Sequence, residues 1–510
     1  MKKQIILLLG ITISFLVMSC YKDKGNYEYT PNEVITAKGI EPAYTVLFNS
    51  NFKINPVVSS SKAEAKFEYF WAIYNKGGAQ LPADTIGRTL NLDYVVTKNP
   101  GSYVLVFGAK NIATGFQQQF TYPISIDTEF TRGWYILKDN GAKTDLDLYL
   151  TPTSLVPSSQ LNNVFSSING KQVEGKARYL SFSAEYQSTV NGSPEYPLAA
   201  TRVLFMTTDK GASVLNVNTL LEIHDFDGMF QGPAPVVKSP TFIGPGTSSY
   251  LFVNAGQLHA LQSNVANLGL FNIAQQRNTT NDSYHLSKYF FSHAFGGQYF
   301  FDETSSSFVS TSGASSMLVS VVDAPGTLLS ANKNNQSLLY MGVKSNTEGV
   351  ALFQDKTTSV KRLGVFTVST AVFKVTSLVP ILNTEKLNDA TLITSNVNDE
   401  SLIYFVVGGN QLWSRNLVSN VEQLQYIAPV GETITYIRHK VYNGFGEESA
   451  YSFNYILVGS SLGGNYKVRM FGKTAGNLNA TPVMTLNGSG NIGDIIYTSP
   501  SLFTYLYNSY

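Results

Sequence analysis

The residues best suited to chemistry are four side chains of metal-binding type in the stretch LEIHDFDGMFQGPAP, which begins at Leu221. They are Glu222, His224, Asp225 and Asp227. A loop could gather such carboxylates around calcium. Alternation along a strand, however, puts the first two on one face and the last two on the other, so the four do not converge on one ion. A polar loop between two repeats is the favoured interpretation, with Asp225 and Asp227 as weak candidate metal ligands.

No catalytic residue can be assigned from the sequence. The five histidines show no paired spacing that would indicate a metal centre. A carboxylate pair for glycoside hydrolysis can come from distant strands, so the sequence alone does not exclude it. The sequence therefore predicts no cofactor and no catalytic site. An extracellular hydrolase or lyase acting on glycans or peptides stays open as the alternative to a binding protein.

Charge and composition exclude one class of partner. Charged residues make up 14% of the chain and the net charge is +1, which provides no field to hold nucleic acid. Hydrophobic residues make up 43%, enough to bury a large core. The polar but uncharged, aromatic-rich composition is typical of extracytoplasmic β proteins, and we expect no nucleic-acid partner.

The only cysteine, Cys20, follows a segment typical of a secretory signal. Lys2 and Lys3 are positive, and the apolar run over 5–17 is shorter than the roughly 20 residues that span a bilayer. The junction Val17-Met18-Ser19-Cys20 resembles the bacterial lipobox. In that pattern, cleavage between Ser19 and Cys20 leaves a lipidated cysteine.

A lipid anchor on Cys20 would explain why the chain has a single cysteine. Without a second cysteine no disulfide can form within the chain, and two or more acyl chains make a stable membrane anchor. We therefore expect residues 1–19 to be a lipoprotein signal peptide and residues 20–35 to be a lipidated tether.

The elements that must position any site are predicted to be all β. Residues 36–130 contain some seven short alternating strands, with Trp71 inside the strand KFEYFWAIYN. This arrangement favours an immunoglobulin-like sandwich with Trp71 in its core. No helical period of useful length appears.

Residues 131–510 repeat one pattern seven times: an apolar strand, a Gly- or Asn-containing turn and a second alternating strand. The blocks are 133–150, 202–217, 250–262, 289–303, 338–354, 403–418 and 455–471. A repeat of about 54 residues is near the blade length of kelch-like propellers. The prediction is a β-propeller of about seven blades, although six or eight blades, or a large irregular β-sandwich, remain open.

Three blocks share a paired-glycine turn, at 296–298, 408–410 and 463–465, where adjacent glycines supply the positive φ of a tight hairpin. The last strand, IIYTSPSLFTYLY, is expected to pair near Gly133 and close the ring. Trp134 and Trp413 lie on predicted blade strands and are expected in the blade cores.

The stretch CYKDKGNYEY from Cys20, followed by Asn32-Glu33-Val34, resembles the start of the PKD-like family of bacterial lipoproteins, and GWYILKDN at 133–140 is also similar to it. The sequence WAIYNKG after Trp71 departs from the W-x-F-G-D-G turn of standard PKD domains. The resemblance implies a lipobox, a PKD/Ig-like module and a larger C-terminal β region.

The same resemblance implies a location and partners. Such lipoproteins resemble accessory components of SusC/SusD-type outer-membrane uptake systems, which would place this chain in the outer membrane, anchored at Cys20 and facing the cell exterior. The resemblance implies a non-catalytic binding or assembly role toward a glycan or peptide. Lys22-Asp23-Lys24 is of mixed charge, whereas known export signals are usually acidic, so either side of the membrane stays open.

Overall fold

A computed structural model describes residues 32–76, 83–151, 159–190, 192, 197–246, 249–262, 269–277, 282–293, 297–311, 317–369, 372–502 and 507–508. The chain divides into two compact units, one ending at Ile126 and the other beginning at Asp127, with Lys98–Pro100 grouped with the second. Only short helices occur in the described ranges, such as α2 (Val164–Asn169), and none of them is long and apolar enough to cross a membrane.

The N-terminal unit is a β-sandwich. Its larger sheet has the order β2-β9-β8-β5-β6, and the pairs β1-β4 and β3-β7 supply the other strands. The strands are β1 (Ile35–Lys38), β2 (Tyr44–Leu47), β3 (Asn51–Ile54), β4 (Val57–Ser60), β5 (Phe67–Asn75), β6 (Asp84–Gly87), β7 (Leu92–Val95), β8 (Gly101–Asn111) and β9 (Gln117–Asp127).

Trp71 lies in the core of this sandwich, as predicted. It is fully buried on β5, an inner strand of the larger sheet, and its ring centroid lies 4.4 Å from that of Phe107 on β8. Its indole Nε1 donates to the carbonyl oxygens of Thr89 and Leu90 at 3.1 and 3.2 Å, so the one polar atom of the side chain is satisfied. The indole therefore serves packing and does not form a ligand platform.

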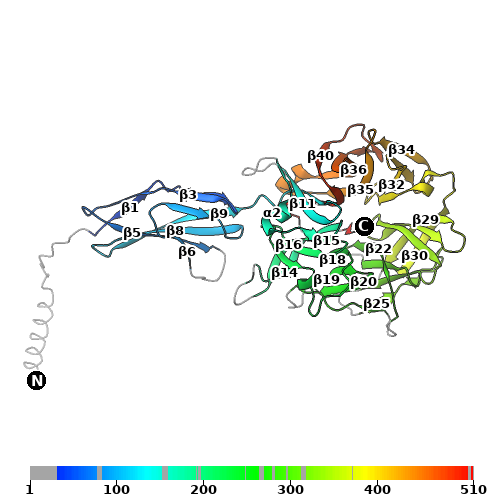
Figure 1. Ribbon diagram of the computed structural model, residues 1–510, viewed down its shortest axis with the longest axis horizontal. Helices are drawn as coiled ribbons and strands as arrows, with labels where there is room; N and C mark the ends of the chain where they lie inside the picture. Colours follow the sequence, from blue (N-terminus) through cyan, green and yellow to red (C-terminus); the bar gives the residue numbers. More distant parts are fainter. Residues whose placement is uncertain are drawn as a thin grey trace, which may run out of the picture. The chain divides into compact units, whose positions relative to one another are not determined.

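Among the described residues, the C-terminal unit contains seven sheets of three or more strands that follow one another around a ring (Figure 1), and a small pair of β38 (Lys473–Thr474) with β39 (Asn477–Leu478). The seven sheets are antiparallel except for the pairs β21-β25 and β26-β30, which are parallel. The first holds β12 (Gln160–Leu161), β11 (Lys143–Leu150), β10 (Gly133–Asp139) and β41 (Asn491–Thr498), with β13 (Val173–Glu174) beside β11. The second holds β14 (Ala177–Ser188), β15 (Ala199–Thr208), β16 (Ala212–Asn216) and β17 (Glu222–Asp225), and the third holds β18 (Pro240–Gly246), β19 (Ser249–Asn254) and β20 (Gln257–Gln262).

The remaining four sheets complete the ring. The fourth holds β22 (Leu286–His293), β23 (Gly297–Asp302), β24 (Ser307–Thr311), β25 (Met317–Ser320) and β21 (Gln276–Arg277), with β42 (Tyr507–Asn508) on the edge of β22. The fifth holds β27 (Gln336–Val343), β28 (Glu348–Asp355), β29 (Lys361–Ser369), β30 (Val372–Pro380) and β26 (Val322–Asp323). The sixth holds β31 (Leu392–Ser395), β32 (Leu402–Val407), β33 (Gln411–Asn416) and β34 (Glu422–Ile427), and the seventh holds β35 (Thr433–Tyr442), β36 (Phe453–Leu462), β37 (Asn465–Phe471) and β40 (Met484–Ser489).

One strand of each sheet contacts the corresponding strands of both neighbours, which makes a closed ring of inner strands: β41, β14, β18, β22, β27, β31 and β35. The ring is closed by the end of the chain, because β41 pairs with β10 and puts Trp134 opposite Tyr497. The sheets are therefore blades of a seven-bladed propeller, and the predicted pairing of the last strand near Gly133 is confirmed.

Each predicted repeat lies in a different blade, but not always at the same place in it. Five blocks cover the second and third strands counted from the axis, whereas 289–303 and 338–354 cover the inner and second strands. The pattern marks any buried hairpin of a blade, because all of these strands are apolar and joined by tight turns. It therefore predicts the number of blades better than their boundaries.

The paired glycines form hairpin turns as predicted where the structure describes them. Gly408 and Gly409 have φ of +61° and +73° between β32 and β33, and Gly463 and Gly464 have φ of +57° and +78° between β36 and β37. Gly297, at φ +97°, begins β23, and Gly296 lies outside the described residues.

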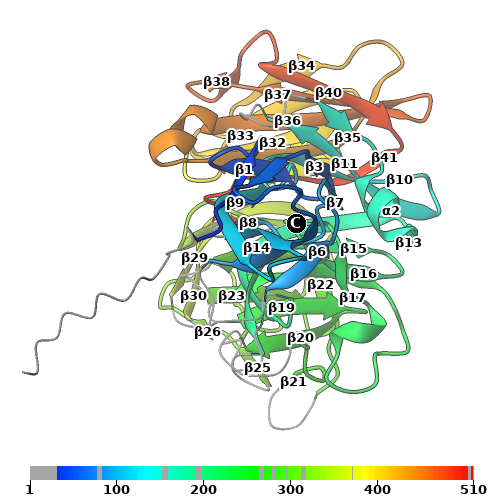
Figure 2. The same ribbon diagram turned by 90° about the vertical axis from the view of Figure 1, so that its left-hand side faces the viewer.

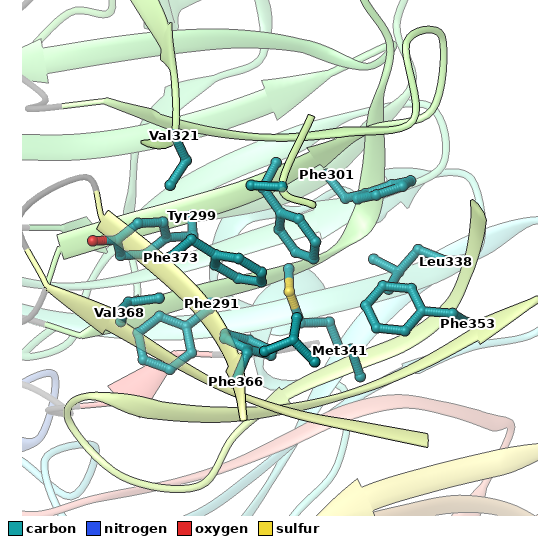
Figure 3. Packing of buried hydrophobic residues seen from close by; sticks show 14 of the residues in the cluster. Phe291, Tyr299, Phe301, Val321, Leu338, Met341, Phe353, Phe366, Val368 and Phe373 are labelled. Atoms are coloured by element: carbon teal, nitrogen blue, oxygen red, sulfur yellow. The ribbon is translucent and has the colours of Figure 1, made fainter. Parts of the chain in front are cut away.

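Aromatic side chains fill the space between neighbouring blades. In the cluster between the fourth and fifth blades, shown in Figure 3, Phe308 and Phe373 stack with ring centroids 4.2 Å apart. Trp134 is buried on β10, as predicted, while Trp413 on β33 is half-buried. The rigid blades leave the loops to shape any binding surface.

Candidate functional site

The residues considered as metal ligands have separate partners, and the ring of His224 lies 6.5 Å from that of Tyr186. Glu222 on β17 pairs with Lys171 at 2.5 Å, Asp225 accepts from the backbone N–H of Gly228 at 3.0 Å, and Asp227 pairs with Lys238 at 2.6 Å. The structure thus holds Asp225 and Asp227 in a local turn and a surface ion pair. No group of three or more His, Cys, Asp or Glu side chains suited to a metal occurs within the described ranges.

The second half of the same stretch lines a pocket. This pocket, of about 960 Å³, is formed by the connection from β17 to β18, the β19–β20 turn and the segment that leads into β21. In Figure 2, β17, β19, β20 and β21 all lie in the green, lower part of the propeller. The volume of the pocket lies within the ordinary range for ligand sites, about 300–1,000 Å³.

Hydrogen bonds fix the two connections that form the pocket walls. The Asn254 side chain accepts from the Ser239 N–H and donates to the Val237 carbonyl, both at 2.8 Å. On the other wall, the N–H groups of Asn272 and Gln275 donate to the carbonyls of β20 residues at 3.1 and 2.7 Å. The described residues of the third blade form three strands, and the second of these segments lies beside the outer one, β20.

The floor of the pocket is aromatic. Phe230 is stacked on Phe252 with centroids 5.6 Å apart and meets Phe271 at 6.4 Å, and all three rings are buried in the core between the second and third blades. Above them, Val236 and Ile273 stand 96% and 84% exposed at the rim. The exposed apolar residues at the rim thus lie above closely packed aromatic rings, whose positions are fixed by that packing.

His259 supplies the one titratable side chain in the lining. Its Nδ1 lies 3.0 Å from the Asn272 carbonyl oxygen, and because a carbonyl can only accept, Nδ1 carries the proton and Nε2 the lone pair. Burial lowers the pKa of His259, against a smaller opposing effect of that hydrogen bond. The imidazole is therefore neutral at pH 7 and serves as a polar contact.

The remaining polar groups of the lining are amides, among them Gln231, Gln257 and Gln276. Amides can both donate to and accept from sugar hydroxyls or peptide groups. An aromatic floor, an apolar rim and several amides make a site suited to holding a neutral polar ligand. The sequence contains one signal for this pocket: the run FQGPAP at 230–235, which is rich in loop-forming residues.

Two short patterns that mark active sites in other folds lie in hairpins here. Residues 459–463 read G-x-S-x-G, but they belong to β36 and its turn, and the serine of the pattern, Ser461, pairs with Thr433 and Tyr466 in the sheet. Residues 488–493 read G-x-G-x-x-G, but they span the turn between β40 and β41. Neither has the strand-to-helix context that its chemistry requires.

The predicted lipidation and cleavage residues, Cys20 and Ser19, lie outside the described residues, as does most of the stretch that carries the family resemblance. The first strand begins at Ile35, and Glu33 before it is already buried, where it accepts hydrogen bonds from Ser60 and Asn111. The ordered sandwich thus begins within the last residues of the expected tether.

The sequence matches the PKD-like family over residues 20–177. The match covers the N-terminal sandwich and continues through β10, β11 and α2 to the first residue of β14. No curated protein matches the chain.

Several solved structures are similar in shape. A quinonprotein alcohol dehydrogenase-like protein from Bacteroides thetaiotaomicron has a TM-score of 0.41 at 11% identity, over 90% of this chain and 97% of that one. A protein from Bacteroides uniformis described as a candidate 6-phosphogluconolactonase has a TM-score of 0.38 at 9% identity, over 84% and 99%. Hsv2p of Kluyveromyces lactis has a TM-score of 0.29 at 11% identity, over 59% and 76%.

Proposed function

We propose that the protein is a lipid-anchored outer-membrane component that binds a neutral glycan or peptide without turning it over. The observation that carries this proposal is the lining of the pocket beside the third blade: apolar and aromatic groups, amides and a single neutral histidine. Such groups can orient a ligand by hydrogen bonds and stacking. General acid–base chemistry would need a group that exchanges protons near pH 7.

The setting of this binding protein is also part of the proposal. The junction Val17-Met18-Ser19-Cys20 supports a lipid anchor, and the PKD-like match over residues 20–177 supports a sandwich module between the anchor and the propeller. A role in SusC/SusD-type uptake, on the outer face of the cell, follows from the resemblance of the first mature residues to that family. A transporter pair encoded next to this chain would support that role.

Calorimetric titration of the whole protein with a panel of neutral oligosaccharides and peptides tests the binding function. The rim residues are the ones to change, because they are exposed and their loss should not unfold the blade. We expect Ile273→Ser and Val236→Ser to weaken binding of the ligand at least tenfold with little change in Tm. Val430, at 103% exposed on the connection between the sixth and seventh blades, provides the matched control Val430→Ser.

Product analysis of the same panel decides between binding and turnover. Release of shortened glycans or peptides by the purified protein, lost in the rim variants, would contradict the proposal and favour a hydrolase or lyase. Binding that responds equally to Val236→Ser and Val430→Ser would place the ligand elsewhere.

A further inference from the structure

A second pocket lies at the seventh blade. It is formed by the connection that leads into β35, the β36–β37 turn and the end of β40, and its lining includes Glu432, Ser460, Asn465, Lys467 and Asn487. We call it the seventh-blade pocket. Its volume of about 390 Å³ is near the lower end of the range for ligand sites, about 300–1,000 Å³, so it suits a ligand of about one sugar unit.

The seventh-blade pocket and the pocket of the third blade occupy equivalent positions in their blades. Each is formed by the connection into the inner strand and by the turn between the second and third strands. Their linings share no residue, and they differ in charge. The described lining of the third-blade pocket contains no Asp, Glu, Lys or Arg, whereas the seventh-blade pocket has Glu432 and Lys467. The two pockets are therefore suited to different ligands.

A buried ion pair forms the base of the seventh-blade pocket. Arg469 on β37 donates to both oxygens of Glu432, at 2.6 and 2.9 Å, and Ser460 Oγ donates to the same carboxylate at 2.5 Å. All three residues are buried. The Arg469 guanidinium also donates to Ser460 Oγ at 3.0 Å and lies 5.9 Å from the ring centroid of Tyr426. Both charges of this pair are thus held by groups of the protein itself.

Lys467 supplies a second cation beside that pair. It lies two residues before Arg469 on β37, on the same face of the strand. Its Nζ is 3.5 Å from Glu432 Oε1, a distance at the limit of a hydrogen bond, and its side chain is 42% exposed. Two cations and one carboxylate leave this group with a net charge of +1, and Lys467 is the member that a ligand can reach.

Another carboxylate near the lining is neutralised separately. Tyr466, which also lines the pocket, donates to Asp147 Oδ2 at 2.6 Å. The other oxygen of Asp147 pairs with the Lys138 ammonium at 2.8 Å, and both side chains of this pair are almost fully buried. Asp147 therefore does not balance the charge of Lys467.

Two side-chain amides lie on the same face of the sheet as Lys467. Asn487 of β40 is directly opposite Lys467, and Asn465 is two residues before it on β37. Both asparagines are exposed, and neither side chain makes a hydrogen bond to any described residue. One ammonium group and two amides are thus available to a ligand in this pocket.

We propose that the seventh-blade pocket binds a small hydroxylated carboxylate, such as a sugar acid. The Lys467 ammonium pairs with the ligand carboxylate through a charge-assisted hydrogen bond, and the amides of Asn465 and Asn487 donate to and accept from its hydroxyl groups. Because Arg469 neutralises Glu432, that carboxylate does not repel the ligand. This acidic ligand is distinct from the neutral one proposed for the third blade.

Calorimetric titration of the whole protein with glucuronate, glucose and acetate, at constant ionic strength, tests the class of ligand. We expect saturable binding of glucuronate. Glucose, which lacks the carboxylate, and acetate, which lacks the hydroxyl groups, should each bind at least tenfold more weakly. Equal affinity of glucuronate and either of the other two compounds would overturn the proposal.

Substitutions of Lys467 test the position of the site. Lys467→Gln should weaken glucuronate binding at least tenfold, whereas Lys467→Arg keeps the charge and should weaken it much less. Lys110→Gln is the matched control, because the Lys110 side chain on β8 is 46% exposed and its Nζ also lies 3.5 Å from a glutamate, Glu68. The same glucuronate affinity in Lys467→Gln and Lys110→Gln would overturn the proposal.

Thermal unfolding separates loss of the site from loss of the fold. A partly exposed ion pair contributes little to stability, so Lys467→Gln should unfold at nearly the same temperature as the unchanged protein, while glucuronate no longer raises its Tm. Ile273→Ser, in the third-blade pocket, should leave glucuronate binding unchanged, so the two proposed sites fail or hold independently. Loss of glucuronate binding in Ile273→Ser but not in Lys467→Gln would place the acid in the third-blade pocket and overturn the proposal.

Discussion

Tyr436 and Asp494 join the seventh blade to the strand that closes the ring. The Tyr436 hydroxyl donates to Asp494 Oδ1 at 2.9 Å, and both residues are buried. Burial, and then the neighbouring carboxylate, keep the pKa of Tyr436 well above its usual value, so the hydroxyl remains a donor. The same carboxylate accepts from Leu180 on the other side, and three successive inner strands therefore meet at one residue.

Tyr436→Phe should destabilise the propeller by about 1–3 kcal/mol, because it leaves a buried carboxylate oxygen with one donor fewer. Denaturant unfolding of the purified protein measures the change. Tyr455→Phe on β36 is the matched control, because its hydroxyl makes no hydrogen bond to any described residue. Equal stability of the two variants would mean that the hydrogen bond contributes nothing to closure.

Gly464→Val should cost about 1–3 kcal/mol through backbone strain alone. Gly464 has φ +78°, and an added Cβ would meet nothing within 4 Å, so a steric clash is not involved. Gly464→Asn should cost less, because asparagine tolerates this region better. Thr485→Val, at an exposed position in β40, is the control, and thermal unfolding of the three variants checks the order.

The stability of the protein should fall as the pH falls from about 6.5 to about 4, because of His439. Burial lowers the pKa of His439 to about 4, against the smaller opposing effect of its hydrogen bond with Asn454. Nδ1 accepts from the Val397 N–H at 2.8 Å, and Nε2 lies 2.6 Å from Asn454 Oδ1. Between these pH values the unfolded chain binds the proton and the folded chain does not. The contribution is therefore complete above pH 6.5, and on the order of 3 kcal/mol is lost by pH 4.

Urea unfolding at several pH values measures this slope. His439→Gln should flatten the profile between pH 6.5 and 4, whereas His285→Gln, at an exposed histidine, should leave it unchanged. An unchanged slope in His439→Gln would assign the pH dependence to other groups.

Cys20→Ala should move the protein from the membrane fraction to a soluble or unprocessed form. The substitution removes the thiol on which the expected lipid is built, and no other cysteine can replace it. Fractionation of cells and gel migration of the product measure the change. Unchanged membrane association would contradict the anchor, and Ser14→Ala within the apolar signal segment should have no such effect.

Blade number and strand pairs were predictable because they depend on local patterns. The alternation in 403–418 and the paired glycines at 408 and 409 describe one hairpin completely. The pocket was not predictable, because Phe230 and Ile273, which both line it, come together only after the blades are arranged. The partner of Asp227 was not predictable either: Asp227 is close to Asp225 in sequence, but it pairs with Lys238, eleven residues further on.

The pairing of β41 with β10 also determines when folding can finish. Asn491 bonds to Asp139 across 352 positions of sequence, and contacts between such distant residues form slowly. During synthesis the edge of β10 stays unpaired until β41 has been made. A product that stops before β41 would expose that edge to other chains. Only a chain that extends through Thr498 can therefore complete its own first blade.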